Sequence, residues 1–286
     1  MIDYDRYDFE IDGAVLKKYN GDSPAVVIPE GVEKIGYDAF AGKSTLVEAT
    51  FPKSLKVIGF SAFKSCSSLS AVNLPEGLTA INDEAFRFCG KLKSVKLPEG
   101  LVSIGRWAFT DCAQLESIAL PKSVKSIGFS AFSGCKSLSD ILLPDGLSGV
   151  EDYLFSGCAS LKSITIPSSS SLIGKWAFKD CTALESIVIP DKTQEVGEGA
   201  FKNCISLKSA ALSENLVSVG RWSFSGCASL AEIFIPKRVT VIDMCAFADC
   251  PNLTIYCETK KPLFGLPKKW NKDWLGGNGA KVIWNK

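Results

Sequence analysis

The stretch LKSVKLPEGLVSIGRWAFTDC, residues 92–112, contains the pattern that decides the fold. Its phenylalanine belongs to a series of ten that recur every 23 residues without insertion or deletion: Phe40, Phe63, Phe86, Phe109, Phe132, Phe155, Phe178, Phe201, Phe224 and Phe247. A fixed period between about 20 and 50 residues indicates a solenoid, a propeller or a repeat array. We therefore expect one structural unit to recur along the chain.

Other columns of the repeat keep the same step. A leucine stands six residues after each phenylalanine, from Leu46 to Leu253, and opens the pattern Leu-x-x-Ile-x-Leu. This pattern predicts a short strand with inward apolar side chains, and the proline that usually follows, as at Pro98, ends it because it has no N–H to donate. The glycine after the second aliphatic residue, as at Gly105, suits a corner that needs a positive φ or a close backbone approach. Stacked coils bury together what one coil cannot bury alone.

The cysteines follow the repeat as well. Nine of the eleven stand three residues after a phenylalanine: Cys66, Cys89, Cys112, Cys135, Cys158, Cys181, Cys204, Cys227 and Cys250. We expect reduced, packed thiols, because parallel neighbouring side chains keep their Cβ atoms further apart than the ~3.8 Å of a disulfide. Cys245 and Cys257 have poor spacing for zinc, and the chain has no histidine. We expect no metal and no cofactor.

Composition narrows the possible partners. The formal net charge is +1, which gives no reason to expect a nucleic acid or an anionic membrane as partner. No apolar run reaches the ~18 residues that membrane insertion needs. The first residues, MIDYDRYDFEIDG, are acidic and lack an apolar core, so we expect no signal peptide.

The repeat unit, L-x-x-I-x-L-P-x-x-L-x-x-I-G-x-x-A-F-x-x-C, resembles the BspA-like (Treponema pallidum type) leucine-rich repeat, over about residues 28–258. The resemblance implies a right-handed, β-rich solenoid of ten repeats, with short parallel strands on one face and turns or short helical segments on the other. It also implies a single elongated domain, with an N-terminal cap at 1–27, the repeat array at 28–258 and a C-terminal cap at 259–286. Local departures include Leu154 and Ser223 in the alanine column.

The same resemblance implies binding rather than catalysis, commonly at the bacterial surface and in adhesion or protein–protein contact. The family motif fixes no ligand-binding residues. Independently, the absence of histidine removes histidine triads and histidine general bases. No glycine-rich phosphate loop follows a strand, and no buried carboxylate pair suggests glycoside hydrolysis. We expect a protein that is not an enzyme.

Function in a solenoid is expected on the outward columns of the strands. The column two residues after the leucine is small and polar, whereas the column four residues after it turns apolar in the later repeats. An exposed apolar stripe often marks a binding site, although aromatic and β-branched residues are common in any strand. The candidate residues for a ligand or partner are Leu142, Val188, Phe234, Ser163, Ser186, Ser209 and Glu232.

The motif IGRWAF returns as IGKWAF and VGRWSF and places a cation before a tryptophan in three repeats. The tryptophan column also holds Asp38 and Glu84, so we expect it to face outward. Adjacent side chains diverge, so each cation is expected to contact an aromatic ring of a neighbouring repeat rather than its own tryptophan. The column is either a brace over the repeat edge or a secondary contact surface, formed by Arg106, Trp107, Lys175, Trp176, Arg221 and Trp222.

Two hypotheses of function follow. The first is a non-catalytic module that binds a protein or glycan through the sheet face. The second is a structural or adhesive spacer that presents the C-terminal segment, with Lys260, Lys261, Lys268, Lys269 and Trp270. Location is contradictory, because the resemblance implies the cell surface or secretion, while free thiols and the lack of a signal peptide favour the reducing cytoplasm.

Overall fold

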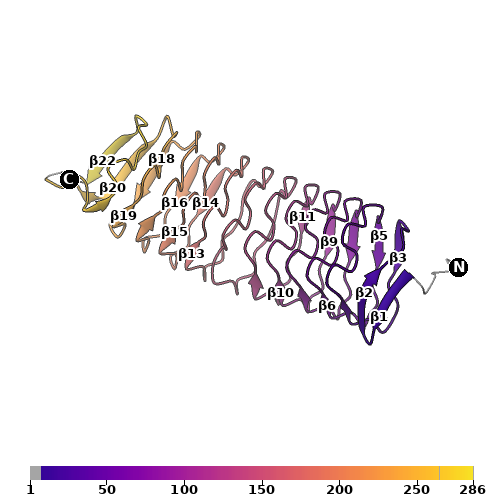
Figure 1. Ribbon diagram of the computed structural model, residues 1–286. Helices are drawn as coiled ribbons and strands as arrows, with labels where there is room; N and C mark the ends of the chain where they lie inside the picture. Colours follow the sequence, from indigo (N-terminus) through magenta and orange to yellow (C-terminus); the bar gives the residue numbers. More distant parts are fainter. Residues whose placement is uncertain (1–7, 264, 286) are drawn as a thin grey trace. The chain divides into compact units, whose positions relative to one another are not determined.

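The computed structural model describes residues 8–263 and 265–285. The chain divides into two compact units, the N-terminal unit, Met1–Pro144, and the C-terminal unit, Asp145–Lys286. Both units consist of successive coils, and the strands of one coil pair with those of the next (Figure 1). The leucine-rich-repeat solenoid predicted from the 23-residue period is confirmed in each unit.

The N-terminal unit contains two sheets. The seven-stranded sheet has the order β1-β2-β4-β6-β8-β10-β12 and the five-stranded sheet the order β11-β9-β7-β5-β3. The first consists of β1 (Phe9–Asp12), β2 (Val15–Tyr19), β4 (Lys34–Ile35), β6 (Val57–Ile58), β8 (Ala80–Ile81), β10 (Ser103–Ile104) and β12 (Ser126–Ile127). The second consists of β3 (Ala25–Val27), β5 (Glu48–Thr50), β7 (Ala71–Asn73), β9 (Ser94–Lys96) and β11 (Ser117–Ile118). The pair β1–β2 is antiparallel, and the coils that follow pair in parallel.

The C-terminal unit also contains two sheets, each with five strands, in the orders β13-β15-β17-β19-β21 and β14-β16-β18-β20-β22. The first consists of β13 (Leu172–Ile173), β15 (Glu195–Val196), β17 (Ser218–Val219), β19 (Val241–Ile242) and β21 (Lys269–Trp270). The second consists of β14 (Ser186–Val188), β16 (Ser209–Ala211), β18 (Glu232–Ile235), β20 (Thr254–Lys260) and β22 (Lys281–Asn285).

Two features differ from the expected coil. The strands were predicted on one face, but the Ile-Gly corners contribute two-residue strands to a second sheet in each unit. Between these sheets the described residues form turns and no α-helix. Residues 141–143 and 163–166, although they carry the strand pattern, lie outside the assigned strands. The predicted cap segments also take part in the pairing, since β3 pairs with β5 and β22 pairs with β20.

The core of each unit is a stack of phenylalanine rings, all of them buried. In the N-terminal unit the rings of Phe63 and Phe86 stack with their centroids 5.4 Å apart, and in the C-terminal unit those of Phe178 and Phe201 lie 5.3 Å apart. Tyr19 stacks on the first ring of the N-terminal unit, and Trp274 meets the last ring of the C-terminal unit edge-on. The 23-residue period therefore places identical rings one above another.

The corner glycines are required for a close backbone approach and not for a positive φ. A Cβ atom on Gly59 would lie 2.4 Å from the carbonyl oxygen of Ile35, and one on Gly105 would lie 2.4 Å from the amide nitrogen of Asp83. Positive φ angles occur instead two residues before each phenylalanine, as at Trp107 with 53°, and two residues after it. Of the two reasons offered for the corner glycine, only the close approach applies.

No helix among the described residues is long and apolar enough to cross a membrane.

Candidate functional site

One sheet of the C-terminal unit carries an outward apolar ladder: Val188, Ala211, Phe234, Tyr256 and Ile283, one from each strand. The first three are exposed, and Tyr256 and Ile283 are half-buried. Val188 is paired with Ala211, and Tyr256 lies between Phe234 and Ile283. The strands alternate between buried and outward residues, so Val188 remains 68% exposed and Phe234 61% exposed. The two predicted residues of this unit thus belong to one continuous row.

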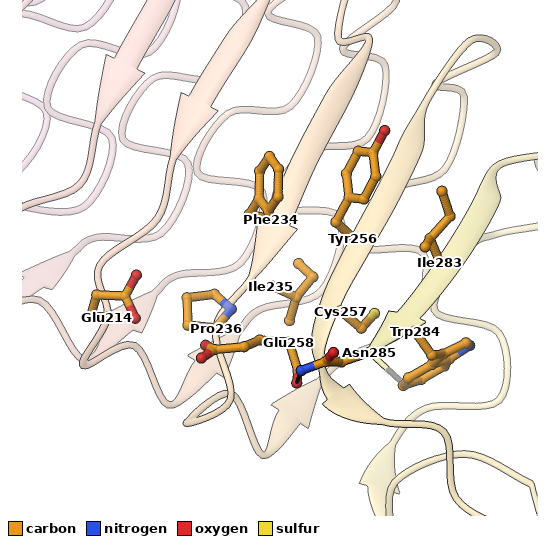
Figure 2. Close-up of a pocket in the computed structure, with 10 residues that line it drawn as sticks. All are labelled: Glu214, Phe234, Ile235, Pro236, Tyr256, Cys257, Glu258, Ile283, Trp284 and Asn285. Atoms are coloured by element: carbon orange, nitrogen blue, oxygen red, sulfur yellow. Dashed lines mark hydrogen bonds between the residues drawn. The ribbon is translucent and has the colours of Figure 1, made fainter.

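A groove of about 600 Å³ lies at the C-terminal end of the apolar ladder. Figure 2 shows Phe234, Tyr256 and Ile283 side by side on adjacent strands, with Glu214 and Glu258 below them. The rings of Phe234 and Tyr256 stack, with their centroids 4.8 Å apart and their planes 13° from parallel. The groove therefore combines an aromatic wall with a rim that carries carboxylates.

The predicted polar column flanks the apolar ladder. Ser186, Ser209 and Glu232 are exposed and lie in register on consecutive strands. Ser163 belongs to a segment without an assigned strand, but it lines a smaller groove of about 380 Å³ together with Ser186 and Val188. The structure thus brings these four polar residues to the same face as the apolar ladder.

Leu142 is the predicted apolar residue of the N-terminal unit. It is 71% exposed and follows Ile141, which is buried. The expected alternation is therefore present even though residues 141–143 form no strand. Leu142 belongs to the other compact unit and is not part of the apolar ladder.

Sequence reasoning missed the last two members of the apolar ladder. Tyr256 follows Phe234 by 22 residues instead of 23, so it falls outside the column that contains Val188 and Phe234. The signal that would have found it is local: in TIYC, residues 254–257, Ile255 and Cys257 alternate with Thr254 and Tyr256. Their burial follows this alternation. Ile283 lies in the segment expected to be a cap, although its strand continues the parallel pairing.

The tryptophan column is half-buried and not simply outward. Trp107, Trp176 and Trp222 are of intermediate exposure, whereas Glu84 in the same column is buried. Glu84 is paired with Lys64 at 2.7 Å and with Arg87 at 3.1 Å. Burial alone would raise the pKa of Glu84, but its hydrogen bonds with these two cations outweigh burial and lower it. A carboxylate is thus accepted in this column because two cations neutralise it.

The expected arrangement of cations and rings is confirmed in one repeat and wrong in another. Arg106 lies over Phe129 of the next coil, with its guanidinium carbon 5.2 Å from the ring centroid. Arg221, however, lies over its own Trp222 at 4.1 Å. The expectation assumed an extended backbone, which neither tryptophan has, since φ is 53° at Trp107 and 54° at Trp222. Lys175 is exposed, and its amide donates to Asp152.

Trp176 and Trp222 meet although a whole coil separates them in sequence. Their ring centroids are 6.1 Å apart, and Lys202 lies 5.8 Å from the first and 5.2 Å from the second. The intervening coil has Gly199 in the tryptophan column, and a Cβ atom there would lie 2.1 Å from the Trp176 ring. This glycine is therefore what lets the two indoles approach. We refer to Trp176, Gly199, Lys202, Arg221 and Trp222 as the indole cluster.

The thiol column offers no accessible nucleophile. The Sγ of Cys89 donates to the carbonyl oxygen of Phe63 at 3.1 Å, and Cys112 and Cys204 repeat this contact with Phe86 and Phe178. The nine cysteines of the column are buried, as expected for packed side chains, and of the other two Cys257 is buried and Cys245 is half-buried. Burial raises the pKa of the Cys66 thiol to about 12. Among the described residues no cluster of side chains is suited to hold a metal ion.

The C-terminal lysine cluster is only partly available to a partner. Lys260, Lys261, Lys268 and Lys269 are exposed. Trp270, however, is buried, with its ring centroid 5.1 Å from that of Trp274, and its Nε1 donates to the carbonyl oxygen of Val239. The tryptophan belongs to the core, so only the lysines can be presented.

Comparison with known proteins agrees with the coil geometry. A family model described as BspA type leucine-rich repeat region, with six copies, matches residues 18–139 and 130–254. The solved leucine-rich repeat protein of T. pallidum is 27% identical, with a TM-score of 0.56 over 79% of this chain and 89% of its own. A leucine-rich repeat protein from Bacteroides ovatus is 25% identical, with a TM-score of 0.52 over 98% of this chain and 100% of its own.

A leucine-rich cell surface protein from Faecalibacterium prausnitzii is 24% identical, with a TM-score of 0.55, and it covers 97% of this chain and 93% of its own. At that identity the likeness concerns the fold. No curated protein matches the chain.

Proposed function

Since the chain belongs to the BspA-type leucine-rich repeat family, we propose that it is a non-catalytic module that holds a protein partner on the apolar ladder of its C-terminal unit. The observation that carries this proposal is the in-register row of outward apolar side chains from Val188 to Ile283. Val188, Ala211 and Phe234 are exposed in this row, and Tyr256 and Ile283 are half-buried. A contiguous apolar surface of this kind, rimmed by polar groups, is typical of an interaction site.

The C-terminal end of the apolar ladder offers a partner an aromatic anchor. The stacked rings of Phe234 and Tyr256 form a rigid aromatic anchor beside the groove of about 600 Å³. Buried aromatic anchors contribute most of the binding energy in protein interfaces, and the surrounding polar contacts exclude water. Ser186, Ser209 and Glu232 provide such a polar border along the apolar ladder. We assign to this surface a role in protein–protein interaction or adhesion.

The test compares three forms of the protein in affinity capture from extracts of the source organism and of its surroundings. The first is the wild type. The second, the ladder variant, carries Val188→Lys and Phe234→Lys, and the third, the control, carries Ile205→Lys and Val217→Lys. The control residues are exposed apolar residues of the same unit that lie off the apolar ladder. Circular dichroism first establishes that all three are folded.

We expect a protein that binds the wild type and the control and is lost from the ladder variant, because charge on the apolar face must be desolvated on binding. Titration of the purified partner should then show a loss of affinity of at least a hundredfold. Capture that is equal in all three forms, or lost equally from both variants, would contradict the assignment.

The second candidate is a spacer that presents its C-terminal lysines, and the exposure of Lys260, Lys261, Lys268 and Lys269 favours it. Replacing these four by glutamate reverses the charge without touching the buried Trp270. A partner that is lost from this variant, and retained by the ladder variant, would favour the spacer.

A further inference from the structure

The indole cluster of the C-terminal unit has a counterpart in the N-terminal unit that differs in one decisive residue. There, Lys64 and Arg87 stand one residue after their phenylalanines, and both bind the carboxylate of Glu84. The same three positions of the repeat are occupied in the C-terminal unit by Lys179, Lys202 and Gly199. The carboxylate that neutralises the cations in one unit is thus replaced by a glycine in the other.

Lys202, which stands at the position of Arg87, consequently has no counter-ion of its own among the described residues. Arg221 has none there either, although its counterpart Arg106 does not bind Glu84. In the part of the chain that the structure describes, no carboxylate lies within salt-bridge distance of Lys202 or Arg221. Lys179 is paired with Asp180, and Asp180 also accepts a hydrogen bond from Asn203 at 2.8 Å. Lys202 acts on Asp180 only through its charge.

Arg221 leaves one donor unsatisfied. Its Nε is buried and has no acceptor among the described residues, and its terminal nitrogen reaches only the sulfur of Met244 at 4.0 Å. Guanidinium and ammonium groups form their strongest hydrogen bonds with carboxylate, sulfate or phosphate oxygens. What points to an oxyanion ligand is therefore the charge of Lys202 and of the terminal guanidinium nitrogens of Arg221, since neither meets a carboxylate among the described residues. The buried Nε does not by itself indicate a ligand, because the Nε of Arg87 also lacks a partner among the described residues although Arg87 binds Glu84.

The backbone around the indole cluster limits what that ligand can be. The amides of Trp176, Gly199 and Trp222 donate to carbonyl groups of the following coils, at 2.7, 2.7 and 3.2 Å. An extended peptide, which binds through free backbone groups, finds no such edge here. Recognition must rely on side chains, namely two aromatic faces and two cations.

We infer that the indole cluster binds an acidic glycan, with its sulfate or carboxylate groups on Lys202 and Arg221 and a sugar ring against the indoles of Trp176 and Trp222. The C–H face of a sugar carries a partial positive charge, which suits the negative face of an aromatic ring. On Lys202 the oxyanion takes the role that Glu84 has on Arg87 in the N-terminal unit. This site is independent of the apolar ladder.

The test follows the indole N–H signals of Trp176 and Trp222 by nuclear magnetic resonance, after assignment with Trp176→Phe and Trp222→Phe. The full chain is titrated with a sulfated heparin hexasaccharide and with hexagalacturonate, which is carboxylated. Neutral cellohexaose and a hexaglutamate peptide serve as comparison ligands. We expect both acidic glycans to shift the two indole signals, and cellohexaose and the peptide to leave them unchanged.

Variants separate the indole cluster from general charge attraction. The double change Lys202→Gln and Arg221→Gln should weaken binding of the acidic glycans at least tenfold. The control, Lys192→Gln and Lys208→Gln, removes two lysines that are exposed in the same unit and should change affinity less than twofold. The ladder variant should bind the glycans as the wild type does.

Four outcomes would overturn the inference: no shift of either indole with both acidic glycans at millimolar concentration, an equal shift with cellohexaose, stronger binding of hexaglutamate, or an equal loss in the control variant. The third outcome would assign the indole cluster to an acidic peptide.

Discussion

At the scale of single residues, this protein can be understood from the exceptions in its columns. Alanine precedes the phenylalanine in most repeats, as at Ala177 and Ala200, but Ser223 takes that place in the ninth repeat. Its side chain is fully buried, and its hydroxyl has no hydrogen-bond partner among the described residues. A buried polar group without a partner lowers stability by about 1–3 kcal/mol.

Ser223→Ala should therefore raise the free energy of unfolding by about 1 kcal/mol, since it removes a desolvated hydroxyl and leaves the alanine typical of the column. The matched control is the reverse change one repeat earlier, Ala200→Ser, which should lower the free energy by a similar amount. Urea denaturation measures both. A destabilising Ser223→Ala would show that the hydroxyl has a role that the structure does not reveal.

At the scale of the element, strand β18 contains both core residues and an exposed residue of the proposed interface within four positions. Ile233 and Ile235 are buried with 1% exposure, whereas Phe234 between them is 61% exposed. One face of the strand, with Ile233 and Ile235, thus belongs to the core, and the other, with Phe234, belongs to the apolar ladder.

Ile233→Ala should lower the free energy of unfolding by about 2–5 kcal/mol, because it leaves a cavity in a packed core. Phe234→Ala should lower it by no more than about 1.5 kcal/mol, the worth of its stacking on Tyr256. Thermal and chemical denaturation of the two variants provide the comparison. Equal losses would mean that Phe234 is a structural residue and would remove the anchor from the proposed interface.

The strands that could be predicted are those that show a period. Outward and inward residues in β14, β16 and β18 follow from the pattern Leu-x-x-Ile-x-Leu, because alternation over five or six residues distinguishes the two faces. The second sheet could not be predicted in this way, since strands such as Ser103–Ile104 are too short to show alternation. Tyr256 was missed for a related reason: one shortened repeat moves it out of its column.

The indole cluster could not be predicted from the sequence, because the columns of the repeat do not show which side chains are in contact. The tryptophans and their basic neighbours could be read from the three motifs. Their contact could not, because it joins residues 46 positions apart and requires the glycine between them. Arg221 also contradicted the rule that adjacent side chains diverge, because the rule assumes an extended backbone and the whole tryptophan column has a positive φ.

At the scale of the whole molecule, the buried thiols link stability to pH in both units. Burial raises the pKa of Cys66 from 9.0 to about 12 and that of Cys250 to about 11. Cys89 and Cys204 are shifted in the same direction, also by burial. In the unfolded chain these thiols ionise near pH 9, whereas in the folded chain they remain protonated.

The contribution of these thiols is therefore complete below pH 9 and is lost as the pH rises from about 9 toward 12. The free energy of unfolding should fall above pH 9 by about 1.4 kcal/mol per pH unit for each buried thiol. Denaturation under reducing conditions between pH 8 and pH 11 measures this slope. In a variant with Cys89→Ala and Cys112→Ala, the free energy of unfolding should fall less steeply with pH, by the contribution of two thiols. An unchanged slope would contradict the explanation.

The bonds between coils also determine how each unit would respond to a mechanical load. The amide of Phe178 donates to Ala200 and that of Phe201 to Ser223, so these bonds run from one coil to the next. Under a pull along the stacking direction, the hydrogen bonds of the outermost coil break before those of the next coil. Each coil of 23 residues then releases roughly 80 Å of chain. Stretched between two tethers, a unit would yield in a series of small equal steps, and the number of steps would count its coils.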